Sequence, residues 1–385
     1  MAARATDSYD LAVIGGGIVG LAHALAAARA GQRTVVIERD VRANGASIRN
    51  FGFITVTGQA RGDFWRLARR SAEVWSEVAG PAGIGIQHQG LVLALRRPES
   101  VAVADAFLAT EMGEGCARLD AATFADRYPE FAGAGALGAL VSPYELRVES
   151  PLALPKLAAW LAREHGVTFR YGTAAWQAAP PVIETSRGPI RAARAVVCPG
   201  DDFAGLFPER IDAHGLRRCR LSMLQLASPG FRLQAGLMSD LGLSRYRGYA
   251  DLPEAAALTA RLAAEQPAHL ANGVHLIAVQ NADGTLVVGD SHHYDDLPAP
   301  FAPAEAEALI LDEYAQATGL PPPPVIARWT GTYAVSDARP YLVDAPSPEV
   351  RLVMVTSGAG ASTAFGIAES VIAELCGHSP DREPS

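Results

Sequence analysis

The chain has 385 residues, of which 49% are hydrophobic and 19% are charged, so it can bury a sizeable core as a globular protein of one or two domains. Its net charge of −8 argues against nucleic acid as a main partner. Lys156 is the only lysine among 33 basic residues, so arginine and histidine must do nearly all the cationic work.

The four cysteines, Cys116, Cys198, Cys219 and Cys376, are scattered and form no C-x-x-C pair. This distribution indicates a reducing, cytoplasmic setting and predicts no structural zinc and no other metal site. Residues 11–30 are apolar enough to be mistaken for a membrane span, but their glycines and the acidic residues before them argue for a strand–turn–helix unit. We therefore expect no membrane partner.

Residues 9–40 have the order strand, glycine turn, helix, strand. Residues 11–14 form a short apolar run suited to a buried parallel strand, and residues 18–30 form an alanine-rich helix. Residues 34–37 are a second apolar strand, which ends on Glu38. This order is typical of a dinucleotide-binding unit.

Three glycines in G-x-G-x-x-G spacing follow the first strand. The first permits a tight turn, the second lets backbone N–H groups approach a pyrophosphate, and the third lets the helix pack on the strand. The helix N-terminus favours phosphate, and the acidic residue after the second strand is placed to bind ribose hydroxyls. The predicted cofactor contacts here are Gly15, Gly17, Ile18, Val19, Gly20, Glu38 and Arg39. The alternative is an α/β turn that only packs tightly.

Further along the chain, residues 44–52 form a polar, glycine-rich loop, and residues 150–166 form a helix with a first-turn proline. Residues 195–200 form an apolar strand that ends at Gly200, where a backbone could again pass close to a flat cofactor. Between residues 216 and 324 the pattern favours β-strands with one clear helix, at 304–318.

A second strand and glycine turn lie near the carboxyl end. Residues 352–355 are a buried strand, and residues 358–363 turn into a final helix whose N-terminus could point at a cofactor. This turn contains Gly358, Gly360, Ala361, Ser362 and Thr363, which the family resemblance described below implies are cofactor contacts.

Taken together, these segments resemble the D-amino acid oxidase and sarcosine oxidase family of FAD flavoproteins along nearly the whole chain. The matching pieces are the amino-terminal glycine motif, residues 45–47, 196–200, 284–289 and 329–340, and the carboxy-terminal glycine turn. The resemblance implies that the first motif and Glu38 hold the ADP half of FAD. It also implies that Ser47, Arg49 and Asn50 lie against the pyrophosphate or the flavin, and that residues 358–363 contact the pyrimidine edge of the flavin ring.

The same resemblance implies an α/β fold with a Rossmann-type FAD-binding domain and a second, α+β substrate domain that carries a large mixed or antiparallel sheet. We expect the FAD-binding domain to comprise residues 1–80, 145–207 and 327–385. The substrate domain would comprise residues 81–144 and 208–326.

Finer features look like one branch of that family, which is linked to the oxidation of aminophosphonates related to 2-aminoethylphosphonate. These features are residues 48–52, 57–59, 289–294 with 298–301, and 358–366.

The sequence departs from better-known relatives in three ways. No cysteine lies between residues 329 and 340, where some sarcosine oxidases tether the flavin, so FAD should be bound non-covalently. Glycine oxidase has a carboxylate-binding arginine soon after the glycine that matches Gly331, whereas Thr332, Tyr333 and Ala334 stand here. The lysine with which monomeric sarcosine oxidase promotes oxygen reduction is absent from residues 286–289.

Flavin-dependent amine oxidation needs a neutral amine with its C–H placed over the flavin. His292 and His293 come after a predicted strand that faces the flavin by resemblance, so either imidazole could accept the ammonium proton. The alternative is that one of them only hydrogen-bonds the backbone.

A phosphonate dianion needs cations, for which Arg49, Arg339, Arg245 and Arg247 are candidates. Arg49 has the strongest positional case, although it could instead pair with an FAD phosphate. Residues 245–249 could roof the pocket or form an exposed loop. The predicted catalytic residues are Arg49, His292, His293 and Arg339.

The sequence thus predicts a cytoplasmic FAD-dependent amine oxidase that deaminates or N-dealkylates a small anionic amine, most simply an aminophosphonate. Dioxygen would be the acceptor, and the products would be aldehyde, amine and hydrogen peroxide. One alternative is a D-amino acid, glycine or sarcosine-type oxidase. The other is an electron-transferring flavoprotein dehydrogenase subunit that passes electrons to a protein or quinone.

Overall fold

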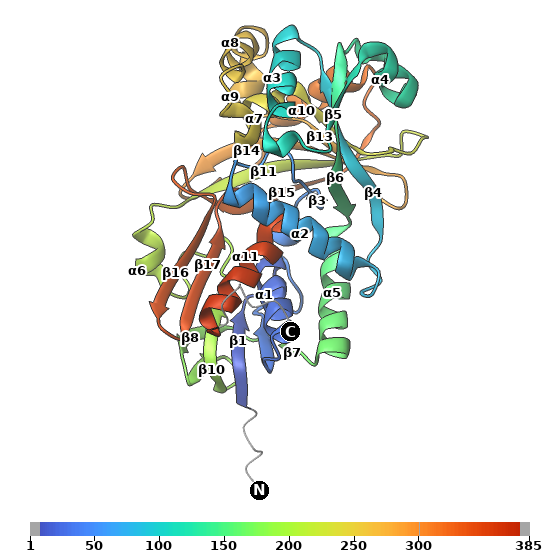
Figure 1. Cartoon of the computed structure of the whole chain (residues 1–385). Coiled ribbons are helices and arrows are strands. Elements are labelled where there is room, and N and C mark those ends of the chain that lie inside the picture. Colours follow the sequence, from blue (N-terminus) through green and yellow to red (C-terminus); the bar gives the residue numbers. More distant parts are fainter. Residues whose placement is uncertain (1–7, 300, 378–385) are drawn as a thin grey trace, which may run out of the picture.

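The computed structural model describes residues 8–299 and 301–377, and two β-sheets organise them (Figure 1). The first sheet has the strand order β16-β17-β10-β1-β2-β7, with the pair β8 and β9 attached to β10. Its strands are β1 (Ser8–Ile14), β2 (Thr34–Ile37), β7 (Thr168–Arg170), β8 (Ala175–Ala179), β9 (Val182–Thr185), β10 (Ile190–Val197), β16 (Tyr341–Ser347) and β17 (Val350–Val355).

The centre of this sheet is parallel, because β17, β10, β1, β2 and β7 all run in one direction. Helix α1 (Ile18–Arg29) packs against α5 (Ser150–His165) and α11 (Gly360–Leu375), and α11 also packs against α2 (Asp63–Ala79). Since β1 leads into α1 and β17 leads into α11, both glycine turns lie at the carboxyl edge of the same parallel sheet.

The second sheet is mostly antiparallel and has the order β15-β11-β14-β13-β12-β4-β6-β3, with β5 beside β6. In Figure 1 it stands above the first sheet. Its strands are β3 (Phe53–Ile54), β4 (Ile86–Leu95), β5 (Ala117–Asp120), β6 (Gly138–Val148), β11 (Arg217–Leu226), β12 (Gly236–Ser239), β13 (Ile277–Gln280), β14 (Leu286–Asp295) and β15 (Val325–Val335).

The remaining helices lie around the two sheets. They are α3 (Pro98–Leu108), α4 (Ala121–Arg127), α6 (Pro208–Asp212), α7 (Arg247–Ala250), α8 (Ala255–Glu265), α9 (Pro267–Ala271) and α10 (Ala304–Thr318), with the 3₁₀ turns η1 (Ala46–Ile48), η2 (Glu111–Gly113), η3 (Pro129–Ala134) and η4 (Asp240–Ser244). No helix in the described part of the chain is both long and apolar enough to cross a membrane.

These observations confirm the predicted fold class, an α/β protein with a Rossmann-type unit and a large mixed sheet. The predicted division into two domains stays a proposal. Strand pairing shows that the chain crosses between the sheets more often than that division implies. Strands β3 and β15 both pair within the second sheet, with β6 and β11, although the division assigned residues 53–54 and most of 325–335 to the FAD-binding domain.

Two local predictions were wrong between residues 216 and 324. The structure has α7, α8 and α9 there in addition to α10. Helix α8 buries only Ala255, Leu258 and Leu262, so its apolar stripe is too sparse to give a clear periodic signal. Strand β14 continues to Asp295 because β11 pairs with it as far as Arg218, so His292 and His293 lie on the strand and not beyond its end.

The close approach of α1 to β1 gives the first test. A Cβ added at Gly20 would lie 1.8 Å from the carbonyl oxygen of Gly15. We expect Gly20→Ala to lower the free energy of unfolding by about 1–3 kcal/mol because backbone atoms must move apart. Denaturant unfolding with excess FAD measures this. Gly80→Ala is the matched control, since its Cβ would meet nothing within 4 Å. Equal unfolding midpoints for Gly20→Ala and wild type would contradict the close packing.

Candidate functional site

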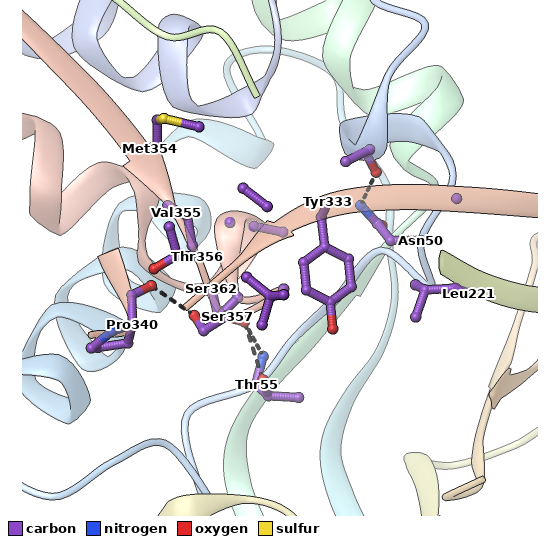
Figure 2. A pocket seen from close by; sticks show the side chains of 18 of the residues that line it. Asn50, Thr55, Leu221, Tyr333, Pro340, Met354, Val355, Thr356, Ser357 and Ser362 are labelled. Carbon is purple, nitrogen blue, oxygen red and sulfur yellow. Dashed lines mark hydrogen bonds between the residues drawn. The ribbon is translucent and has the colours of Figure 1, made fainter. Parts of the chain in front are cut away.

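A cavity of about 610 Å³ is lined by residues from both sheets (Figure 2). From the first sheet come the two glycine turns and Gly200, and from the second come residues of β14, β15 and the segment before α7. The predicted residues in its lining are Gly17, Ile18, Val19, Gly20, Ser47, Arg49, Asn50, Gly200, Gly358, Gly360, Ala361, Ser362, His292 and Arg339. The cavity thus brings together residues from both ends of the chain.

The amino-terminal glycine turn is shaped by backbone contacts. Gly15 has φ +110°, and a Cβ there would lie 2.3 Å from the carbonyl oxygen of Cys198. A Cβ on Gly17 would lie 2.9 Å from Ser47 Oγ, which accepts a hydrogen bond of 3.0 Å from the Ile18 N–H. Ser47 therefore binds the first turn of α1, as well as lining the cavity.

Glu38 holds the glycine turn through its carboxylate. Its two oxygens accept hydrogen bonds from the N–H groups of Gly16 (2.7 Å) and Asp40 (2.9 Å). The side chain is buried next to the turn but does not line the cavity. The arrangement orders the backbone that a phosphate would approach, and this positioning role was not anticipated from the sequence.

Arg39 lies outside the cavity lining. Its guanidinium is exposed and pairs with Asp202 at 2.7 Å, an interaction that solvent weakens. Gly15 and Thr363 are also absent from the lining. Thr363 is buried in the first turn of α11, where its hydroxyl donates to the Ala359 carbonyl.

The carboxy-terminal turn is held by contacts from other elements. Gly358 has φ +74°, and a Cβ there would lie 3.0 Å from the ring of Tyr333. Ser362 Oγ accepts a hydrogen bond of 2.9 Å from the Thr55 N–H, and Ser357 Oγ donates to the Pro340 carbonyl (Figure 2). These contacts fix the turn between β17 and α11.

The N-termini of α1 and α11 have no side-chain cap and no acidic residue in the first turn. Their N-cap residues, Gly17 and Ala359, both line the cavity. Apart from the Ile18 N–H, which donates to Ser47 Oγ, the first-turn N–H groups have no side-chain acceptor in the described residues. Such groups suit a ligand that carries negative charge and hydrogen-bond acceptors. With the bare backbone of the glycine turns, this arrangement fits the pyrophosphate and the ring edge of FAD.

The loop that contains Arg49 and Asn50 is anchored mainly by backbone contacts. Trp329 Nε1 donates to the Arg49 carbonyl at 3.1 Å, and the Arg49 guanidinium makes no hydrogen bond within the described residues. Asn50 donates to the Ala46 carbonyl and accepts from the Gly52 N–H, so it orders the loop. Arg339 lines the cavity and is exposed.

The second sheet contributes a buried cluster of His275, Asp290 and His292. Nε2 of His275 lies 3.5 Å from Asp290 Oδ1, and Nε2 of His292 lies 3.6 Å from Asp290 Oδ2. Nδ1 of His292 lies 3.0 Å from the Gly273 carbonyl, and the Tyr246 hydroxyl lies 3.1 Å from Nε2 of His275. All three side chains of the cluster line the cavity.

Burial controls the charge of this cluster. It raises the pKa of the Asp290 carboxyl to about 8, against the opposing effect of Arg245. Burial, with Arg245 as the next cause, lowers the pKa of His275 and His292 well below the ordinary value. Both imidazoles are therefore neutral at pH 7, and His292 is a weaker base than the sequence suggested.

Arg245 and three tyrosines stand beside this cluster. Nη2 of Arg245 donates to the Tyr294 hydroxyl at 2.8 Å. Although burial alone disfavours its charge, Tyr294 and Tyr333 are among the groups that hold the pKa of Arg245 above the ordinary value. Tyr246 also lines the cavity, so the segment before α7 forms part of its wall rather than a wholly exposed loop. Arg247 lines the cavity too, but it is exposed and pairs with Asp251 at 3.2 Å.

The structure separates the two predicted histidines. His293 is absent from the lining and points to Asn272 Oδ1 at 3.2 Å, because successive side chains of a strand face opposite sides. The same alternation places Asp290 and His292 on one face, a signal that could have identified Asp290 from the sequence. His275 could not be found in this way, because its backbone pairs with Asp290 through tertiary contacts.

Comparison with known proteins identifies the family. The model of the family described as "FAD dependent oxidoreductase" (DAO) matches residues 10–375. The chain belongs to this family. Its members depend on FAD, and we propose that the cavity with its two helix N-termini binds it. A search of curated proteins finds no match.

Solved structures of low sequence identity share the fold. Glycine oxidase from Bacillus cereus has a TM-score of 0.77 at 15% identity, over 97% of this chain and 96% of its own. L-proline dehydrogenase from P. horikoshii has a TM-score of 0.78 at 15% identity, over 98% and 96%. Iminodiacetate oxidase from Chelativorans sp. has a TM-score of 0.68 at 16% identity, over 97% of each chain.

The contrast between Glu38 and Arg39 gives a test of the FAD site. Loss of the carboxylate that orders the glycine turn should weaken FAD binding in Glu38→Ala by about 1.5–3 kcal/mol, the range for a hydrogen bond to a charged group. FAD titration of the apoprotein, followed by flavin fluorescence, measures this. Arg39→Ala is the control and should bind FAD as wild type does, because Arg39 lies outside the cavity. Equal FAD affinity of both variants would remove Glu38 from the site.

The attachment of FAD gives a further test. Cys198 is the only cysteine in the lining, and burial raises the pKa of its thiol well above the ordinary value, so it remains a protonated, unreactive thiol. We expect acid precipitation to release all flavin into the supernatant. Flavin that stays with the precipitate would show a covalent bond and contradict the predicted non-covalent cofactor.

Proposed function

We propose that this protein catalyses the FAD-dependent oxidation of a small anionic amine, and that the amine is an aminophosphonate related to 2-aminoethylphosphonate. The observation that carries the proposal is Arg245, a half-buried guanidinium that lines the FAD cavity with Tyr246, Tyr294 and Tyr333. Its only side-chain hydrogen bond within the described residues goes to a neutral hydroxyl, Tyr294, so its other N–H groups can bind an anion.

The balance of charge in the cavity supports an anionic substrate. Four arginines line it, namely Arg49, Arg245, Arg247 and Arg339, against the carboxylates of Asp290 and Asp337. The FAD pyrophosphate offsets part of this positive charge. Asp337 already pairs with Arg217 at 2.8 Å, and burial favours the neutral form of Asp290. The remaining positive charge favours a substrate with a carboxylate or a phosphonate.

The chain would then position the substrate from both sides. FAD, when bound, accepts a hydride from the carbon next to the amine nitrogen. The guanidinium of Arg245 would bind the acidic group, and the Tyr294 and Tyr333 hydroxyls could donate further hydrogen bonds. Leu221, Ile277 and Phe53 supply an apolar part of the wall, which excludes water from the reacting carbon.

The nature of the anion is the finer part of the proposal. A phosphonate has three acceptor oxygens and up to two negative charges, which suits an arginine fork surrounded by hydroxyl donors. The structural neighbours named glycine oxidase and iminodiacetate oxidase support amine oxidation on this fold, but their names point to amines that carry carboxylates. A glycine-, sarcosine- or D-amino acid-type oxidase is therefore the second candidate.

A substrate panel under two conditions tests the proposal. Anaerobic bleaching of the flavin band by 2-aminoethylphosphonate, its N-methyl derivative, glycine, sarcosine and D-alanine reports amine oxidation whatever the electron acceptor. Peroxide release in air then reports oxidase activity. We expect the aminophosphonates to bleach fastest. Equal bleaching by all five amines would show that the site does not recognise phosphonate, and bleaching without peroxide would identify a dehydrogenase.

A variant of Arg245 tests directly whether this side chain binds the substrate anion. We expect Arg245→Ala to raise KM for an aminophosphonate by one to two orders of magnitude, from about 1.5–3 kcal/mol per charged hydrogen bond, with FAD retained. Arg245→Lys should fall between wild type and Arg245→Ala, since lysine keeps the charge without the fork. Arg261→Ala, on the exposed face of α8, is the control.

An unchanged KM in Arg245→Ala would exclude this side chain as the anion site. Arg49→Ala in the same assay separates the two roles predicted for Arg49. Loss of FAD would assign Arg49 to the cofactor, whereas a raised KM with FAD retained would assign it to the substrate.

The cysteines support the expected cytoplasmic location. All four, Cys116, Cys198, Cys219 and Cys376, are unpaired in the structure. Free thiols are the usual state of cysteine in a reducing compartment.

A further inference from the structure

We propose that His275, Asp290 and His292 form a binding site for a divalent transition-metal ion, best matched by Zn²⁺, whose open side faces the cavity. One ligand atom from each residue can be chosen so that all three lie within 4.8 Å of one another. The inference goes beyond the proposed amine oxidation and does not depend on which substrate is oxidised.

The distances suit a small ion. Zinc binds imidazole nitrogen and carboxylate oxygen at about 2.0–2.2 Å, which separates two ligands of a tetrahedron by about 3.4 Å. The two imidazole nitrogens lie 3.5 Å and 3.6 Å from the nearest oxygens of Asp290. An ion could therefore enter the cluster after small movements of the side chains.

The protonation of the histidines also suits a metal. Because the Gly273 carbonyl accepts a hydrogen bond from Nδ1 of His292, Nε2 carries the lone pair that faces Asp290. The Tyr246 hydroxyl can donate to Nε2 of His275, which then carries a lone pair as well. Both Nε2 atoms therefore offer lone pairs close to the oxygens of Asp290.

One oxygen of the cluster has no hydrogen-bond partner in the described residues. Asp290 Oδ1 is buried and has no hydrogen bond in the described part of the chain. All three side chains are more than nine-tenths buried, with exposed fractions of 2% for His275, 3% for Asp290 and 7% for His292. A buried carboxyl oxygen without a hydrogen-bond partner is costly, and a cation that displaces the carboxyl proton and binds this oxygen and two imidazoles would remove that cost.

Two nearby side chains, Arg245 and Tyr246, oppose the binding of an ion. Arg245 carries positive charge towards Asp290 and opposes a second cation, so we expect the ion to bind more tightly when an anion occupies the cavity. Tyr246 must release His275 Nε2 on metal binding, and its hydroxyl can then turn to the cavity. The fourth ligand would come from the cavity as water or as an oxygen of an anionic ligand.

The set of two nitrogens and one oxygen determines the class of metal. Two imidazoles and one carboxylate favour zinc and neighbouring first-row ions over Mg²⁺ and Ca²⁺, which prefer shells of oxygen ligands. No cysteine takes part in the site. The spacing of the cysteines, on which the prediction of no metal site was based, therefore could not reveal it. The three ligands lie in two segments of the chain that only the second sheet brings together.

Calorimetric titration of the FAD-loaded protein with ZnCl₂ tests the site. We expect one Zn²⁺ per chain in wild type, and binding weaker by more than about 100-fold in Asp290→Asn and His275→Gln, since even partners outside the ligand shell are worth about 10–100-fold. His293→Gln is the matched control, because it makes the same change at the next residue, on the other face of β14. MgCl₂ should give no comparable binding.

The outcomes decide the proposal directly. Retention of the flavin absorbance shows that each variant is folded. Absence of saturable zinc binding in wild type would overturn the proposal whatever the variants do. Equal zinc binding in wild type, Asp290→Asn and His293→Gln would place the metal elsewhere on the surface and overturn it as well. If His275→Gln fails to fold, anomalous scattering from zinc-soaked wild-type crystals locates the ion, and zinc away from Asp290 would exclude the site.

Discussion

The proposed FAD site depends on the close packing of α1 against β1 and the glycine turn that follows it. Gly20 passes so close to the Gly15 carbonyl that no side chain fits between them. This contact brings the N-terminus of α1 to the carboxyl edge of the parallel sheet. Helix α11, which follows β17, begins at the same edge. Neither helix has an N-cap side chain that binds its first turn, and both N-termini face one cavity. A larger residue at position 20 would move the first of them away.

The two sheets contribute different chemical groups to the site. The first sheet presents bare backbone and helix ends, which suit the phosphates and ring edges of a nucleotide. The second sheet and the segment before α7 present ionisable side chains, among them Asp290, His292 and Arg245, in a mostly buried wall. Burial acts in opposite directions on acids and bases, so it keeps Asp290 and the histidines near neutrality, while the hydrogen bond to Tyr294 helps to preserve the charge of Arg245. The cavity therefore has one strong cation beside a weakly charged cluster.

Strand β15 joins these two parts. It belongs to the second sheet, yet Trp329 donates to the Arg49 carbonyl, and the ring of Tyr333 packs on Gly358. Arg49 and Gly358 lie in loops that start from the first sheet. A movement of β15 would thus shift the loop after β2 and the turn before α11 together. This coupling explains why a division of the chain into two sequence-defined domains describes the pairing of β15 poorly.

The sequence alone determined the Rossmann-type unit, because glycine spacing, a short apolar strand and an alanine-rich helix are local signals. It also determined the second glycine turn and the family. It could not place His275 beside Asp290, show which of His292 and His293 faces the cavity, or bring Arg245 to the cavity wall. The first two outcomes depend on the pairing of β14 with β11 and β13, and the third depends on how the segment before α7 packs. Only the tertiary structure decides which side chains share a wall, because pairing partners far apart in the chain leave no local pattern.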